Sequence, residues 1–167
     1  HSANYGGKKG ATMAPGGSNV RLRGKAIYLI DSVAITGNII SDTTTNILID
    51  HSMDVTLSGN TFFAPKPGHL TVTNSERVIV SGNTFNPRQF ERTGTIHFKD
   101  SKDCVLTGNT LHQFDTPDGA LILENCEGFT VNGLSLTDCG SGIVLKNTRD
   151  TLIANCSARR IADGAAA

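Results

Sequence analysis

The chain has 167 residues, and its 15 Lys and Arg residues balance its 15 Asp and Glu residues, which gives a formal net charge of zero. This length permits one domain with a buried core. The balanced charge argues against a nucleic-acid partner, and the absence of any apolar run of about 18 residues argues against a membrane-spanning helix.

Residues 1–20 come first in the chain. They are Gly-rich and polar and show no strand alternation, so we interpret them as a loop or arm. Residues 21–167 carry a repeated phrase, clearest as Ser/Thr-Gly-Asn, whose central positions are Gly37, Gly59, Gly82, Gly108, Gly133 and Asn155. Successive differences between these numbers are 22, 23, 26, 25 and 22. A period of this size predicts one stacked-repeat domain over residues 21–167.

Each repeat has apolar residues at fixed distances from its central glycine. The column ten residues before it holds Ile27, Ile49, Val72, Phe98, Leu123 and Leu145. Similar columns lie two and twelve residues before it and three residues after it, with mixed residue types between them. This period of two predicts short strands with one buried face: two clear strands per repeat and a third after the glycine.

The central glycine and the residue after it predict a turn between two of these strands. Glycine, or asparagine in the last repeat, tolerates a positive φ and suits a sharp bend. The next column holds Asn38, Asn60, Asn83 and Asn109, followed by Leu134 and Cys156. Asparagines stacked in register can bond amide to amide along the stack, so we expect these four side chains to form a ladder.

These features predict an all-β chain folded as a parallel β-helix of about six coils. The Ser/Thr-Gly-Asn-Thr-Phe/Leu turns and strands such as Leu70–Ser75 and Ile96–Ser101 resemble the right-handed parallel β-helix repeat superfamily, which includes pectate lyases, polygalacturonases, alginate epimerases and phage tailspikes. The resemblance covers about Arg21–Ala158. It implies a right-handed helix and an extracellular or periplasmic location.

The last residues of the chain indicate how the stack of coils is expected to continue. Ala162–Ala165 resembles Pro117–Ala120, which opens the fifth coil, so a seventh coil is expected to begin there. An open stack end exposes unpaired backbone groups and an apolar layer. We therefore expect the helix to be part of a longer one, with a partner chain or missing coils over its open ends.

Three longer connections, Phe63–Gly68, Asn86–Gly94 and His112–Gly119, all lead into the same strand of the coil. Loops that lengthen on one edge of a repeat stack usually frame its binding face. We therefore take candidate residues from the outward positions of this strand and from the loops. The candidate catalytic residues are His97, Lys99 and Glu124, and the candidate substrate-binding residues are His69, Arg88, Arg92, His112, Asp115 and Asp118.

The partner expected on this surface is an anionic or hydroxyl-rich polysaccharide. Arg can bind a carboxylate through two hydrogen bonds, and Lys or His can remove the proton beside a uronate carboxyl group, as β-elimination requires. Alternatively, Asp115, Asp118 or Glu124 can supply the acid and base of glycoside hydrolysis. In the simplest interpretation, Lys99 and Glu124 form only a surface ion pair, which adds little stability.

Signatures of individual families give limited help. Ile49-Asp50-His51 is similar to an Ile-Asp-His triplet of pectate lyases, which adds Asp50 and His51 to the candidates, but the Trp usual before that triplet is absent. The motifs of polygalacturonases are missing. The resemblance thus implies a carbohydrate-active lyase, glycoside hydrolase or epimerase, or alternatively a non-catalytic module that binds carbohydrate or a surface, as adhesins and tailspikes do. Whether the chain is an enzyme stays open.

The sequence suggests neither a metal site nor a cofactor. The four cysteines, Cys104, Cys126, Cys139 and Cys156, lack the two-residue spacing of zinc or redox motifs. Three of them stand in columns that other coils fill with Val, Ser or Asn, so we expect free, partly buried thiols. Acids such as Asp100 and Asp103 fall in turns, where we expect them to fix the backbone.

Overall fold

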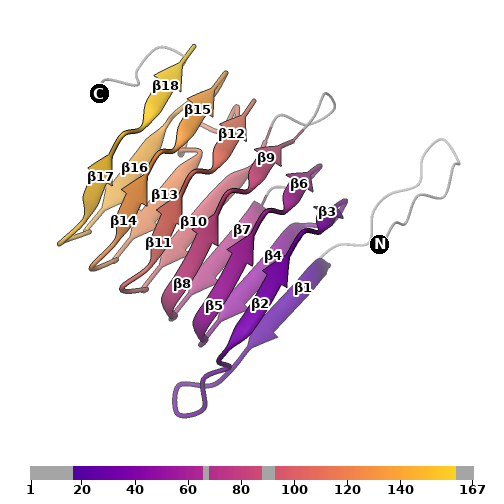
Figure 1. Cartoon of the computed structure of the whole chain (residues 1–167), viewed down its shortest axis with the longest axis vertical. Coiled ribbons are helices and arrows are strands. Elements are labelled where there is room, and N and C mark those ends of the chain that lie inside the picture. The colour runs from indigo at the N-terminus through magenta and orange to yellow at the C-terminus, as the bar shows by residue number, and fades with distance from the viewer. Residues whose placement is uncertain (1–16, 66–67, 88–92, 161–167) are drawn as a thin grey trace, which may run out of the picture.

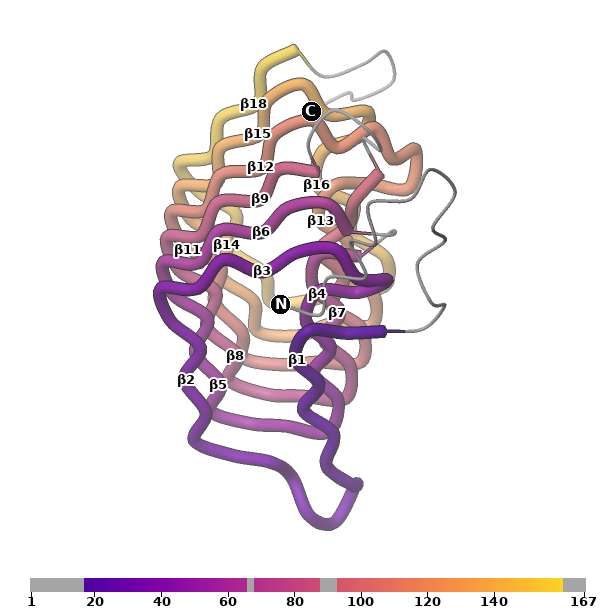
Figure 2. Tube along the Cα trace, turned by 90° about the vertical axis from the view of Figure 1, so that its right-hand side faces the viewer, coloured from indigo at the N-terminus to yellow at the C-terminus, as the bar shows by residue number. Residues whose placement is uncertain are grey.

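The chain winds into a stack of coils, each built from three short strands (Figure 1). The computed structural model describes residues 17–65, 68–87 and 93–160, which contain three parallel sheets of six strands each. Every sheet takes every third strand, so each coil contributes one strand to each sheet, and the end view in Figure 2 shows the coils one behind another. The predicted all-β parallel β-helix of about six coils is confirmed.

The sheets are named here by the order of their strands within a coil. Sheet A contains β1 (Ser18–Arg23), β4 (Thr45–Asp50), β7 (Gly68–Thr73), β10 (Thr95–Lys99), β13 (Leu121–Glu124) and β16 (Ile143–Lys146). Sheet B contains β2 (Val33–Thr36), β5 (Met53–Ser58), β8 (Glu76–Ser81), β11 (Val105–Thr107), β14 (Thr130–Asn132) and β17 (Leu152–Ala154). Sheet C contains β3 (Ile39–Ser41), β6 (Thr61–Phe63), β9 (Thr84–Asn86), β12 (Thr110–His112), β15 (Ser135–Thr137) and β18 (Ser157–Arg159).

Like residues lie over like residues in the interior. In sheet A, Ile49, Val72, Phe98 and Leu123 follow one another in register, and all four are fully buried. Leu145 continues this file but is 47% exposed, because no described coil lies beyond it. Burial of such a side chain contributes roughly 1.5–3 kcal/mol, so each inner coil gains its buried face by stacking on its neighbours.

The first coil departs from the predicted alignment. Ile27, expected in the buried column, is 79% exposed, and Leu22 of β1, which pairs with Ile49 and is partly buried, takes that position instead. After β1 the chain makes an extra turn, in which Lys25 and Tyr28 bond each other's backbone N–H and C=O groups at 2.9 Å. The extra turn lengthens the segment between Leu22 and Gly37 by five residues (27 − 22). The residue ten positions before Gly37 is therefore Ile27, which does not belong to the buried column.

The predicted arm is only partly within the described residues. Residues 1–16 lie outside them, and β1 begins at Ser18. None of the described residues belongs to a helix that is long and apolar enough to cross a membrane.

The repeat glycines form the corner between sheets B and C. All five have a φ of 61–67°, as the predicted bend requires. Beside them, Asn38, Asn60, Asn83 and Asn109 form the predicted ladder. The side-chain NH₂ groups of Asn38, Asn60 and Asn83 each donate to the amide oxygen of the next asparagine at 3.0–3.2 Å, and that of Asn109 donates to the backbone carbonyl of Val80 at 2.8 Å. Each acceptor oxygen also receives the backbone N–H of the preceding asparagine. We call these four side chains the buried ladder.

Candidate functional site

His97, Lys99 and Glu124 lie together on the outer face of sheet A. Lys99 Nζ donates to Glu124 Oε1 at 2.6 Å, and His97 Nε2 lies 3.4 Å from Glu124 Oε2. The three side chains meet because β10 and β13 pair in register and residues two apart on a strand share a face. They are 26–42% exposed. Sequence reasoning thus grouped these residues correctly, while their catalytic role stays a prediction.

The ion pair favours the charged form of both partners. The hydrogen bond and the charge of Glu124 raise the pKa of Lys99, and the same contact lowers the pKa of Glu124. A lysine that acts as a general base must be neutral when it takes the proton, and a glutamate that acts as a general acid must be protonated. The contact therefore opposes these two roles at neutral pH, and it leaves Glu124 ionised, as a general base requires.

A second polar cluster is centred on Asp50 at the end of β4. Its carboxylate accepts hydrogen bonds from Thr73 Oγ1 at 2.9 Å and Asn74 Nδ2 at 3.1 Å, faces His51 Nδ1 at 2.8 Å, and lies 3.6 Å from Arg23 Nε. Burial acts to raise the pKa of Asp50, but the hydrogen bonds from Asn74 and Thr73 and the charge of His51 together lower it. Asp50 is thus a carboxylate that joins neighbouring coils.

His69 does not lie on the outer face, where the sequence predicted it. It is fully buried, and its ring centroid lies 5.0 Å from that of Phe114, 5.6 Å from Phe85 and 6.4 Å from Phe62. Burial lowers its pKa to about 3, and its Nε2 has no hydrogen-bond partner among the described residues. A neutral ring enclosed in this way cannot contact a polysaccharide, so the expected position was wrong.

The reason is an irregularity in the pairing of β7 with β10. Thr95 pairs with Gly68, but the next residue, Ile96, pairs with Leu70. His69 is therefore an extra residue in β7, as in a β-bulge, and it faces inward instead of outward.

The remaining candidates have separate positions. His112 lies on β12 in sheet C, where its Nδ1 is 3.5 Å from Asp138 Oδ2, so the structure separates it from His97, Lys99 and Glu124. Asp115 and Asp118 are exposed in the connection between β12 and β13. Arg88 and Arg92 lie outside the described residues.

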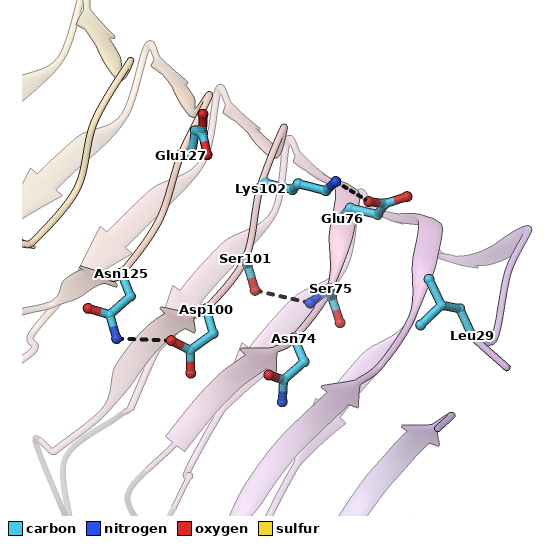
Figure 3. A pocket seen from close by; sticks show the side chains of 9 residues that line it. All are labelled: Leu29, Asn74, Ser75, Glu76, Asp100, Ser101, Lys102, Asn125 and Glu127. Carbon is cyan, nitrogen blue, oxygen red and sulfur yellow. Dashed lines mark hydrogen bonds and ion pairs between the residues drawn. The ribbon is translucent and has the colours of Figure 1, made fainter. Parts of the chain in front are cut away.

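A trough that sequence reasoning missed follows the corner between sheets A and B (Figure 3). It has a volume of about 420 Å³. It is lined by Leu29, Asn74, Ser75, Glu76, Asp100, Ser101, Lys102, Asn125 and Glu127, and we call it the corner trough. All of these residues stand six to eight positions before a repeat glycine. The polar residues in these columns were the signal that could have revealed it.

The cysteines are free thiols, as expected. Burial raises the pKa of Cys104 to about 12 and also raises the pKa values of Cys126 and Cys139. In the described parts of the chain, no group of three or more His, Cys, Asp or Glu residues is arranged to hold a metal ion.

Comparison with known proteins gives a family but no individual relative. No curated protein matches the chain, and no solved structure does. A family model described as "Periplasmic copper-binding protein (NosD)" matches residues 8–166. The proteins of this family are right-handed parallel β-helices, which agrees with the fold and the predicted superfamily, and their periplasmic location agrees in coarse terms with the one expected. Because the match spans nearly the whole chain, this protein belongs to the NosD family.

Proposed function

We propose that the chain is a non-catalytic periplasmic module that binds a polysaccharide. The observation that carries this proposal is the 2.6 Å contact between Lys99 Nζ and Glu124 Oε1. The sequence left an enzyme and a binding module open. This contact supports the binding module, because the raised pKa of Lys99 opposes its role as the base of β-elimination and the lowered pKa of Glu124 opposes its role as the acid of glycoside hydrolysis.

The repeated outer surface supports a ligand that is itself a repeat. Neighbouring strands of a sheet lie about 4.8 Å apart, so the stack presents similar polar groups at this interval. On sheet A, for example, Thr73, Lys99 and Glu124 are direct neighbours in register. A chain of hydroxyl-bearing units can contact several coils at once and add many weak contacts together. A polysaccharide has this character.

The family description raises copper as another ligand, and the described residues do not fit it. Thiolate and thioether sulfur suit copper(I), and imidazole suits copper(II). Burial keeps the thiols of Cys104, Cys126 and Cys139 protonated at neutral pH, which makes them poor ligands. His69 is enclosed by phenylalanine rings, and His97 faces Glu124. We derive no copper chemistry from these residues.

A combined binding and turnover assay tests the proposal. The purified chain is titrated by calorimetry with neutral, acidic and amino oligosaccharides, and each mixture is then analysed for new reducing ends and for the unsaturated products of β-elimination. We expect at least one oligosaccharide to bind and none to be cleaved.

Two outcomes would overturn the proposal. If none of the oligosaccharides binds, the chain is not a carbohydrate-binding module. If products form, and are lost in Lys99→Met but retained in Lys146→Met, the chain is an enzyme. Lys146 is a suitable control, because it occupies the same column of sheet A one coil beyond Glu124.

A further inference from the structure

The corner trough has two polar walls and a floor of serines (Figure 3). One wall, the amide wall, consists of Asn74, Asp100 and Asn125, and the other, the charged wall, consists of Glu76, Lys102 and Glu127. The floor residues Ser75 and Ser101 are buried, and their hydroxyls donate to backbone carbonyls of their own coils. The volume lies within the range of roughly 300–1,000 Å³ that is usual for ligand pockets.

The amide wall has unused acceptors at its centre. Asn125 Nδ2 donates to Asp100 Oδ1 at 2.9 Å, and Asn74 Nδ2 donates to Asp50 Oδ1 at 3.1 Å. Within the described residues no hydrogen bond joins Asn74 to Asp100, and Asp100 has no ion-pair partner. The amide oxygen of Asn74 and the second carboxylate oxygen of Asp100 are therefore available as acceptors on two neighbouring coils.

The charged wall is held by ion pairs. Glu76 lies 3.0 Å from Lys102 Nζ and 2.6 Å from Arg77, and Glu127 lies 2.6 Å from Arg149. Because these cations are already paired with carboxylates, the wall can exchange hydrogen bonds with hydroxyl groups but has little unpaired positive charge for an anion. The Asp100 carboxylate across the trough, which has no ion-pair partner among the described residues, disfavours an anionic ligand further.

The extra turn of the first coil closes one end of the trough. Leu29 lines this end (Figure 3), and the backbone on both sides of Ile30 is fixed to the second coil by hydrogen bonds with His51 at 3.1 Å and Met53 at 2.8 Å. The turn requires glycine at position 24, because a Cβ on Gly24 would lie 2.2 Å from the backbone oxygen of His51. Leu29 gives the polar trough an apolar end, which suits the C–H face of a sugar ring.

We propose that the corner trough binds a neutral, hydroxyl-rich glycan chain that lies along the stack axis, an inference that rests on the proposed function. In an extended β-linked chain, each pyranose unit advances by a length similar to the coil spacing of about 4.8 Å. Successive sugars therefore meet successive coils. Their hydroxyls donate to Asn74 and Asp100 and accept from Lys102. Because the polar walls span three coils, they hold about three sugar units.

Calorimetric titration with matched oligosaccharides tests this inference. The probes are cellohexaose as the neutral chain, hexagalacturonate as the anionic chain and cellotriose as the short neutral chain. We expect cellohexaose to bind, cellotriose to bind within about threefold of it because the trough is already filled, and hexagalacturonate to bind at least about tenfold more weakly.

Two sets of variants locate the site. In the double variant Asp100→Asn, Lys102→Ala, we expect affinity for cellohexaose to fall about tenfold or more, as the loss of charge-assisted hydrogen bonds would cause. Asparagine is the residue that Asn74 and Asn125 provide in the same column, so Asp100→Asn leaves an acceptor for Asn125 and should preserve the fold. The control Arg160→Ala removes an exposed ion pair with Asp138 elsewhere on the coil and should change affinity by less than about twofold.

The outcomes separate this inference from the proposed function. If the trough variant binds cellohexaose normally while His97→Ala, Lys99→Ala abolishes binding, the ligand lies on the outer face of sheet A and the trough inference is wrong. Selective binding of hexagalacturonate also overturns the inference and leaves polysaccharide binding intact. If no oligosaccharide of any charge binds, the proposed function fails and the trough inference fails with it.

Discussion

Two corners of the same coil carry columns of asparagine with opposite consequences. At the corner between sheets B and C, the buried ladder is continuous, and Asn60, Asn83 and Asn109 are at most 1% exposed. At the corner between sheets A and B, the amide wall is exposed, and its hydrogen bonds stop between Asn74 and Asp100. The same residue type thus holds the fold together where its hydrogen bonds are complete and leaves acceptors for a ligand where they are not.

The largest effect is expected from Asn83→Ala in the buried ladder. The substitution removes the acceptor for two N–H groups of Asn60 and the donor to the carbonyl of Leu57. A buried group without its partner costs about 1–3 kcal/mol, so we expect the free energy of unfolding to fall by about 5 kcal/mol in urea denaturation. A fall of less than about 2 kcal/mol would mean that the ladder is not a main support of the fold.

The next largest effect concerns His69 and acid. Its pKa is lowered from 6.5 to about 3 in the folded chain. The unfolded chain therefore binds this proton first, so the stability that the neutral ring provides is present above pH 6.5 and is lost as the pH falls from 6.5 towards 3. We expect a loss of roughly 4 kcal/mol from this group.

The matched variant for this prediction is His69→Phe. Its neighbours are phenylalanines, and the new ring cannot be protonated. Urea denaturation across the same pH range should show a shallower loss of stability in the variant than in the parent chain. Parallel pH profiles for the two proteins would contradict the assigned burial.

Asn125→Ala tests the exposed side of the comparison. The substitution removes hydrogen bonds to Asp100 and from Asn147. Because water can replace both partners at this surface, we expect the free energy of unfolding to change by less than about 1 kcal/mol. If Asn125→Ala and Asn83→Ala destabilise the chain equally, the buried ladder supports the fold no more than the exposed amide wall does, and the contrast between the two corners is wrong.

The smallest effect is expected from Lys99→Met on the outer face of sheet A. Loss of the ammonium group removes the contact that lowers the pKa of Glu124, so that pKa should rise towards its ordinary value. A carboxyl titration followed by NMR measures it directly, with Lys146→Met as the control. An unchanged Glu124 pKa would remove the main observation in favour of a binding module.

The sequence was sufficient for the fold because the fold depends on repetition. Val72 and Phe98 were predicted to lie over each other from spacing alone, and they do. Predictions from the repeat spacing were wrong where the chain departs from its regular period. Because of the inserted turn, counting ten residues back from Gly37 leads to Ile27, whereas Leu22 occupies that column in the structure. An extra residue in β7 places His69 in the interior. Neither event changes the average period, so no count of apolar residues could reveal it.

The candidate sites were harder to predict for a different reason. His97, Lys99 and Glu124 were grouped correctly because they lie on paired strands, where register determines the neighbours. The corner trough depends on turn residues such as Asp100, which we interpreted only as fixing the backbone. Its φ of 50° agrees with that role. Whether a carboxylate oxygen of Asp100 stays without a hydrogen bond depends on the directions in which the side chains of adjacent coils point. A single sequence does not contain these directions.

The most direct test of glycan binding at the exposed corner is an NMR map of the backbone amides during titration with cellohexaose. We predict that the ligand changes the amide chemical shifts of residues 74–76, 100–102 and 125–127. These three segments lie side by side only because the coils stack. Shift changes confined to residues 97–99 and 122–124 on sheet A, or spread without relation to the trough, would contradict the claim that the exposed corner of the coil is the one that binds.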